Sequence, residues 1–406
     1  MARTVTVYFG TNRMPITDAT GERIVDFGSD PGPIDGVAVR FGSAEVKVSS
    51  VRKAKLVAGS LYVAPEKLIP PNQRRGSRDV FDQLREDMRE GGRPTLVHIH
   101  GFSNSFTDAM ERAAIVLDFY GIDANVFSFT WPSRNSGGPI PLPYVDYLHD
   151  RETSRESGLA MARTLRILYD YINSLPDRDR CRQPLHLICH SMGNYALRHA
   201  LQALMRLPVS EAREYAPASG SQPIPSAQSA APTAGEGFPA LIGLPTENRD
   251  PNRLRRTFDQ IIMAAADEDE DAFEDELELK YLPRLAAGIT VYHTGRDWIL
   301  NTLSRYTKFN GPRLGSDGPE SMASISDKVS AVDVSDVIDP EQDFESHQYY
   351  RLSPAVRDDI VAVLSGARAD QVAKRRPTGS LRRYRLIATA GARTRKPPSR
   401  RRDLNR

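Results

Sequence analysis

Ser191 stands where a nucleophilic serine is expected. The apolar run Leu185–Cys189 leads into His190-Ser191-Met192-Gly193, and a helix-forming stretch follows at once. A sharp strand-to-helix turn exposes the serine hydroxyl, and the helix N-terminus behind it favours developing negative charge. Such a turn needs small residues two before and two after the serine, where Cys189 and Gly193 stand. We therefore predict a nucleophile elbow, although a buried serine in an ordinary strand–turn–helix fits the same pattern.

A serine nucleophile needs a histidine base and an acid that orients this histidine. Asp297 follows the strand-like run Ile289–His293, and His347 follows the strand-like run Val329–Val334 and a polar loop. The chain order serine, acid, histidine is the one expected for a nucleophile elbow. Because sites in parallel sheets form beyond the carboxyl ends of strands, we predict His347 as the base and Asp297 as the acid.

Each of these predictions has an alternative. Asp297 precedes an apolar stretch and would also suit a helix N-cap. His347 would also suit an exposed loop. Asp267, which ends another strand-like run, is the second candidate for the acid.

Two backbone N–H groups are predicted to bind the oxyanion of a tetrahedral intermediate. One comes from the loop after the strand-like run Thr95–His100, and the other from the residue after the nucleophile. This assigns Phe102 and Met192. Trp131, which follows another strand-like run, either lines an acyl pocket or packs as a buried aromatic.

Neither of two metal-like patterns is complete. His98 and His100 alternate along one strand, but no further ligand has matching spacing, so packing and loop hydrogen bonding are favoured. The acidic run 267–271 with Glu278 resembles a calcium loop, but Ala272 stands where that loop needs glycine. We predict no metal and no organic cofactor.

The candidate residues lie along an alternation of short apolar and longer amphipathic runs. The strand-like runs are Thr95–His100, Asn125–Thr130, Leu185–Cys189, Gln260–Ala265, Ile289–His293 and Val329–Val334. The helix-like runs are Ser77–Glu90, Ser105–Tyr120, Glu152–Ser174, Met192–Leu207, Asp271–Ala287, Trp298–Phe309 and Pro354–Leu364. Alternating strands within the first 65 residues enter the sheet in an antiparallel or mixed manner. The order predicts βαβ units in a mostly parallel central sheet with helices on both faces. Together with the predicted elbow at Ser191, it indicates the α/β-hydrolase fold.

Two segments interrupt this order and one follows it. Residues 208–252 are rich in Ala, Pro, Ser and Gly and have too few large apolar residues to fold, so we predict a low-complexity insertion. Residues 311–327 form a polar loop. From residue 366 the chain is basic and rich in Pro and Arg. We predict one domain, 1–365, and a largely disordered tail, 366–406.

The formal net charge of +2 hides an asymmetry. Residues 366–406 contain 14 Lys and Arg and 2 Asp and Glu, a net charge of +12. Residues 1–365 contain 40 basic and 50 acidic side chains, a net charge of −10. The tail would attract an anionic surface, nucleic acid or membrane; the alternative is a solvated tail that folds back on the acidic body. Specific nucleic-acid recognition by the tail is not predicted, since Tyr384 is the one aromatic residue between residues 366 and 406.

The sequence indicates no export or membrane insertion. Its two cysteines, Cys181 and Cys189, do not form a disulfide framework. The opening residues lack the apolar region of a signal peptide, and no run of 18 apolar residues is present. We predict a protein without a transmembrane segment, located in the cytoplasm.

Several motifs resemble those of a bacterial family of α/β-hydrolases of unknown function. They are Tyr8-Phe9-Gly10-Thr11-Asn12-Arg13, His100-Gly101-Phe102-Ser103-Asn104-Ser105, Phe129-Thr130-Trp131-Pro132-Ser133, His190-Ser191-Met192-Gly193-Asn194, Gly295-Arg296-Asp297, Arg313-Leu314-Gly315 and His347-x-Tyr349. The resemblance covers about residues 5–365, and members usually have Ala or Gly where Cys189 stands. It implies a Ser–Asp–His site, carried here by Ser191, Asp297 and His347, and it implies no substrate.

The chemistry expected from these residues is acyl transfer to water by an esterase-like or lipase-like serine hydrolase. A small-molecule acyl substrate is expected. Transfer to another acceptor would use the same triad. A non-catalytic binding protein is the other alternative, because the first elbow glycine is absent and the insertion and tail are additions. Acyl-chain length and oligomeric state do not follow from the sequence.

Overall fold

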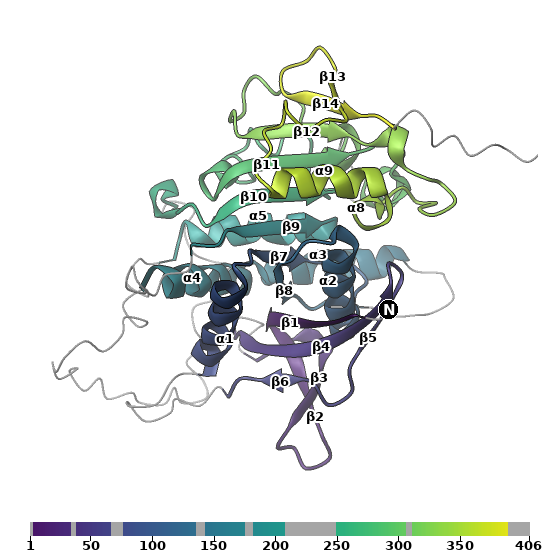
Figure 1. Cartoon of the computed structure of the whole chain (residues 1–406). Coiled ribbons are helices and arrows are strands. Elements are labelled where there is room, and N and C mark those ends of the chain that lie inside the picture. Colours follow the sequence, from purple (N-terminus) through teal and green to yellow (C-terminus); the bar gives the residue numbers. More distant parts are fainter. Residues whose placement is uncertain are drawn as a thin grey trace, which may run out of the picture.

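A mixed sheet of 12 strands forms the centre of the molecule (Figure 1). The computed structural model describes residues 3–33, 38–65, 76–134, 143–174, 182–207, 249–305 and 311–388. Within these residues the strand order is β13-β14-β12-β11-β10-β9-β7-β8-β1-β4-β5, with β6 beside β4.

The eight strands from β14 to β1 in this order run parallel. They are β1 (Arg3–Thr11), β7 (Thr95–Ile99), β8 (Asn125–Thr130), β9 (Leu185–His190), β10 (Phe258–Ala264), β11 (Ala286–His293), β12 (Val329–Asp333) and β14 (Arg383–Leu386). Every residue of β7, β8 and β9 is buried, as expected for parallel strands covered on both faces. The predicted α/β-hydrolase fold class is confirmed.

The antiparallel strands lie at the two ends of the sheet. They are β4 (Arg40–Ser50), β5 (Lys53–Leu56) and β6 (Tyr62–Val63) at one end and β13 (Arg375–Pro377) at the other. The strands β2 (Arg13–Thr17) and β3 (Ile24–Pro31) form a separate hairpin, which projects from the first end (Figure 1).

Helices cover both faces of the sheet. One face packs against α2 (Phe106–Tyr120), α8 (Tyr349–Leu352) and α9 (Pro354–Leu364). The other packs against α1 (Gly76–Gly91), α3 (Pro143–Glu156), α4 (Gly158–Ser174) and α5 (Met192–Leu204). Local signals fix helix ends: Ser105 and Asp108 form a capping box at the start of α2, and Gly121 ends α2 with a φ of 63°.

The predicted helix over Asp271–Ala287 is wrong. This segment forms hydrogen-bonded turns and the short 3-10 helix η5 (Leu282–Arg284), and β11 already begins at Ala286. Pro283 explains part of this result, since proline lacks the N–H that a helix interior needs. In the predicted helix Trp298–Phe309, the described residues 298–305 are helical, and η6 (Leu300–Ser304) is a π-helix.

The first half of the predicted tail belongs to the folded body. Residues 366–388 are described, and they supply β13 and β14 at the sheet end beside β12. The boundary predicted at residue 365 is therefore too early. Arg375 in β13 is only 4% exposed. Basic composition suggested an exposed tail because it does not show which charged side chains are buried. Residues 389–406 and 208–248 of the predicted insertion lie outside the described residues.

No helix among the described residues is both long and apolar enough to cross a membrane.

Candidate active site

Ser191 occupies the turn between β9 and α5 in a backbone conformation with positive φ, at φ 52° and ψ −126°. Such a φ is uncommon for a residue with a Cβ and marks a strained turn. The turn is held by the Ser191 N–H, which donates to the Ala264 carbonyl at 3.0 Å. Gly193 is required because a Cβ there would lie 2.6 Å from the His100 carbonyl oxygen. The strand–turn–helix therefore has the strained geometry of a nucleophile elbow, with Cys189 fully buried beneath it.

His347 and Asp297 form a buried pair. The Nδ1 atom of His347 lies 2.7 Å from Oδ2 of Asp297, and both side chains are at most 3% exposed. Burial lowers the pKa of His347. The Asp297 carboxylate and its hydrogen bond raise this pKa by more than burial lowers it, so the net pKa lies above its ordinary value. Burial raises the pKa of Asp297. The bond to Asp297 places the imidazole proton on Nδ1 and leaves Nε2 as the basic nitrogen.

The second ring nitrogen of His347 is the atom that could accept a proton. Among the described residues, Nε2 is buried and has no hydrogen-bond partner. His190, directly before Ser191, places its ring 4.8 Å from the His347 ring and its Nε2 2.9 Å from the His347 carbonyl oxygen. The elbow and the histidine loop are thus in direct contact.

Asp343 fixes the loop that carries His347. Its carboxylate accepts the backbone N–H groups of His347 at 3.1 Å and Gln348 at 2.8 Å. Ser346, just before the histidine, has a φ of 53°. No local pattern in the sequence distinguishes Asp343 from other loop residues, and His190 stands in the predicted elbow motif without a role of its own.

The loop after β7 lies against the elbow. A Cβ on Gly101 would lie 2.9 Å from the Cβ of Ser191, so the backbone of this loop approaches the serine closely. Phe102 follows in the same loop, and Met192 is the first residue of α5, where N–H groups lack a partner within the helix. Both predicted oxyanion donors are therefore next to Ser191.

Trp131 is a packed aromatic. Its side chain is fully buried and stacks on His100, with ring centroids 5.0 Å apart. Its Nε1 donates to the His100 carbonyl at 3.0 Å. Trp131 thus supports the start of the loop that precedes Phe102.

His98 lies on β7 and His100 directly follows this strand. His98 is wholly buried, and burial lowers its pKa to about 3. His100 makes loop hydrogen bonds to Gly101 and Thr130, as the sequence analysis favoured. Within the described ranges, no group of three or more His, Cys, Asp or Glu is arranged to hold a metal ion.

Asp267 has other partners than a histidine. Its carboxylate accepts the hydroxyls of Tyr147 and Ser304, each at 2.5 Å, and Nε of the buried Arg313 lies 3.9 Å away. Its backbone N–H donates to the Ser191 carbonyl at 3.3 Å. Of the two candidate acids, only Asp297 is brought to His347, and Asp267 supports the elbow.

Arg13 is a buried cation behind the candidate site. Its side chain is 1% exposed, and it donates to the Asn104 carbonyl at 2.7 Å and to Thr130 Oγ1 at 2.8 Å. Burial lowers its pKa to about 9, so the guanidinium remains charged at neutral pH. The sequence signals for Arg13 were its place just after the first strand and its membership in the motif Tyr8–Arg13.

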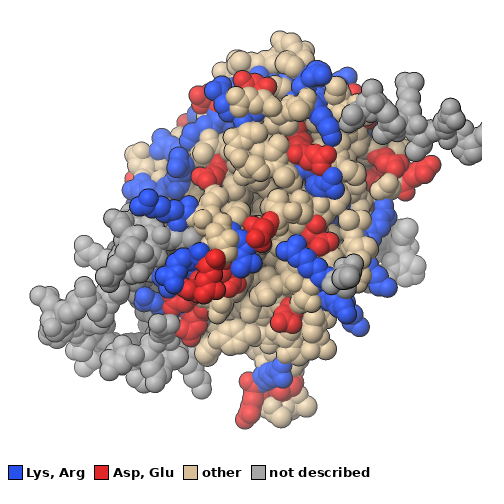
Figure 2. Space-filling view, viewed as in Figure 1, with Lys and Arg blue, Asp and Glu red and all other residues tan. Residues whose placement is uncertain are grey.

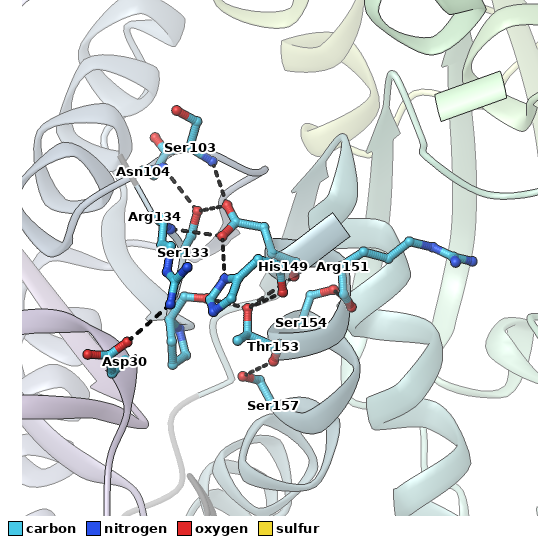
Figure 3. Close-up of polar contacts among 12 residues, drawn as sticks. Asp30, Ser103, Asn104, Ser133, Arg134, His149, Arg151, Thr153, Ser154 and Ser157 are labelled. Atoms are coloured by element: carbon cyan, nitrogen blue, oxygen red, sulfur yellow. Dashed lines mark hydrogen bonds and ion pairs between the residues drawn. The ribbon is translucent and has the colours of Figure 1, made fainter. Parts of the chain in front are cut away.

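Asp150, on α3, connects this helix to the same loops. Its carboxylate accepts the Ser103 N–H at 3.0 Å, the Ser133 hydroxyl at 2.5 Å and the Arg134 N–H at 2.9 Å. Ser133 in turn accepts the Asn104 N–H at 3.1 Å. Figure 3 shows these side chains converging from separate segments, and sequence reasoning missed this convergence.

A family model described as alpha/beta hydrolase of unknown function (DUF900) matches residues 78–368. The matched segment contains Ser191, Asp297 and His347, whereas Arg13 lies before it. No curated protein and no solved structure matches the chain. The match confirms the family that the sequence motifs resemble.

Proposed function

Because the chain belongs to this family of α/β-hydrolases of unknown function, we propose that it is a serine hydrolase acting on a carboxylic ester or a related acyl group. Ser191 is the nucleophile, His347 the general base and acid, and Asp297 the group that orients His347. The observation that carries the proposal is the strained, positive-φ backbone of Ser191 at a strand-to-helix turn in contact with a buried histidine–aspartate pair.

In the first half of the reaction, Ser191 Oγ attacks the acyl carbon while Nε2 of His347 takes the hydroxyl proton. Asp297 stabilises the imidazolium that forms. The tetrahedral oxyanion is bound by the N–H groups of Phe102 and Met192. When it collapses, the bond to the leaving alcohol breaks, and His347 gives this alcohol the proton.

In the second half, water attacks the Ser191 acyl-enzyme. His347 takes a proton from the water, the ester bond to Ser191 breaks, and the proton returns to the serine oxygen. The acid product leaves. Apart from the substrate and water, these steps use side chains and backbone groups of the protein.

Labelling with a fluorophosphonate probe tests this proposal. Wild-type protein is expected to be labelled, and both Ser191→Ala and His347→Ala should lose labelling, because the probe reacts only with an activated serine. Ser304→Ala is a matched control, since Ser304 is a buried serine that donates to Asp267. Folded wild type that refuses the probe would contradict the proposal and favour a non-catalytic binding protein.

A labelled Ser191 would justify a substrate screen with p-nitrophenyl esters of short and long acyl chains. Adding small alcohols or amines as acceptors would separate hydrolysis from acyl transfer. Products formed only with an added acceptor would identify an acyltransferase.

A further inference from the structure

Two side chains hold one carbonyl oxygen in the loop beside Ser191. The Gly101 carbonyl oxygen lies 2.7 Å from Nδ1 of His100, and it accepts a hydrogen bond from Nδ2 of Asn104 at 3.0 Å. The same Asn104 nitrogen donates to the Phe102 carbonyl at 2.7 Å. His100 is fully buried and Asn104 is 3% exposed, so these bonds lie where water competes little.

The partners of His100 identify it as a donor to Gly101. The Trp131 N–H donates to Nε2 of His100 at 3.2 Å, so Nε2 is the acceptor nitrogen. In a neutral imidazole the other nitrogen then carries the proton. Burial holds the pKa of His100 well below its ordinary value, so the ring stays neutral. The Nδ1–H group is thus fixed on the Gly101 carbonyl oxygen.

The amide of Asn104 also acts through its nitrogen. Two carbonyl oxygens face Nδ2, which identifies this atom as the donor. Its Oδ1 atom is buried and has no hydrogen-bond partner within the described part of the chain. A buried acceptor without a partner costs free energy, so the contribution of Asn104 lies in the two carbonyls it holds.

Fixing the Gly101 carbonyl fixes the Phe102 N–H as well. The two groups belong to one planar peptide, and in a trans peptide they point in opposite directions; the described residues contain no cis bond. Gly101 lies against Ser191. Among the described residues, the Phe102 N–H has no hydrogen-bond partner, whereas the next N–H, of Ser103, is bound by Asp150.

We propose that His100 and Asn104 are positioning residues that turn the Gly101–Phe102 peptide so that its N–H faces the oxyanion formed at Ser191. This inference rests on the proposed function, since an oxyanion forms only if Ser191 attacks an acyl group. Without the two donors the peptide can rotate, and the Phe102 N–H loses its fixed direction. The loss should affect kcat more than KM, because the oxyanion exists in the transition state and not in the bound substrate.

The test compares Asn104→Leu with Asn125→Leu in the full-length protein. Leucine has a similar size and no donor. Asn125 is a matched control because it is 7% exposed at the start of β8 and its Nδ2 has no partner within the described ranges. Asn104→Leu should reduce the rate of fluorophosphonate labelling and kcat for p-nitrophenyl butyrate by about 10- to 100-fold, with KM changed less than threefold. Asn125→Leu should behave as the wild type.

A second pair keeps the test decisive if Asn104→Leu does not fold. His100→Asn retains a nitrogen donor near Nδ1, and His100→Leu retains none, so the asparagine variant should recover part of the lost rate. Circular dichroism checks that each variant is folded. If wild type and Asn104→Leu label Ser191 at equal rates, the inference fails alone. If the wild type shows no Ser191-dependent labelling, the proposed function and the inference fail together.

Discussion

At the scale of single residues, Asp297 fits both interpretations that the sequence left as alternatives, a partner of the histidine and a helix cap. Its Oδ2 atom binds His347, and its Oδ1 atom accepts the Leu300 N–H at 3.0 Å, as a helix cap does. A carboxylate has two oxygens and can serve both partners. The cap holds the carboxylate in place, so that the second oxygen can orient the imidazole.

The pH dependence of activity should depend on this pair. His347 must be neutral to act as a base, and Asp297 raises its pKa above the ordinary value of 6.5. Activity should therefore rise with pH, with a midpoint above 6.5. In Asp297→Asn the burial that lowers the pKa remains while its main opposing charge is lost, so the midpoint should move to lower pH. The rate of ester hydrolysis should also fall, on the order of 10⁴-fold, as in other serine triads.

The measurement is kcat/KM for p-nitrophenyl butyrate between pH 5 and pH 9. Asp267→Asn is the control, since Asp267 binds Tyr147 and Ser304 and not His347. A midpoint that stays unchanged in Asp297→Asn would show that this carboxylate does not control the titration of His347.

At the scale of elements, a buried ion pair links β13 to the rest of the domain. Arg375 donates to both carboxylate oxygens of Asp359 on α9, at 2.9 Å and 2.6 Å, and to the Tyr292 hydroxyl on β11 at 3.3 Å. Each side chain of the ion pair is 1% exposed. This contact holds β13, which lies in the predicted tail, against α9 and β11 of the folded domain. An arginine buried this deeply needs an acidic partner, and Asp359 is that partner.

Arg375→Met should lower the free energy of unfolding by about 3–5 kcal/mol, since it leaves Asp359 buried without its cation. Arg376→Met is the matched control: Arg376 is exposed on the same strand, and its replacement should change the value by less than about 0.5 kcal/mol. Urea unfolding followed by circular dichroism measures both. Combining Arg375→Met with Asp359→Leu should restore part of the stability. An equal loss of stability in Arg375→Met and in the control Arg376→Met would contradict the role of the ion pair.

At the scale of the whole molecule, the charge asymmetry of the sequence is less simple in the structure. Figure 2 shows Lys and Arg side chains interspersed with Asp and Glu side chains over one face of the described body. Part of the basic composition of residues 366–406 lies in β13 and β14. Residues 389–406 retain seven Lys and Arg and one Asp, a net charge of +6. Any attraction to anionic surfaces is therefore expected from residues 389–406 and not from the whole of residues 366–406.

Two truncations separate folding from charge. Residues 1–388 should melt at the wild-type temperature, whereas residues 1–365 should unfold at a lower temperature, because they lack β14, which pairs with β12, and β13, which pairs with β14. If the terminal segment contacts anionic surfaces, residues 1–388 should lose binding to phosphatidylserine vesicles at low salt. Equal melting temperatures for both truncations would show that β13 and β14 contribute no stability.

The sequence by itself determined most of the order of strands and helices between Thr95 and Leu364, the turn at Ser191 and the chain order of Ser191, Asp297 and His347. These features follow from local patterns: apolar runs of fixed length, helix caps and polar residues directly after strands. Where local pattern and composition misled, a single residue often explains the failure, as Pro283 does for the predicted helix over Asp271–Ala287.

Only the tertiary structure decided which of these groups meet. Arg13 binds Thr130 across 117 positions of the chain, and His347 pairs with Asp297 and not with Asp267. The order of strands in the sheet sets these contacts, and local periodicity does not encode this order. The same holds for Arg375, whose charge indicates exposure in the sequence and whose partner on α9 becomes visible only in the fold. The reason is physical: burying a charge is favourable only beside its partner, and that partner lies far away in the chain.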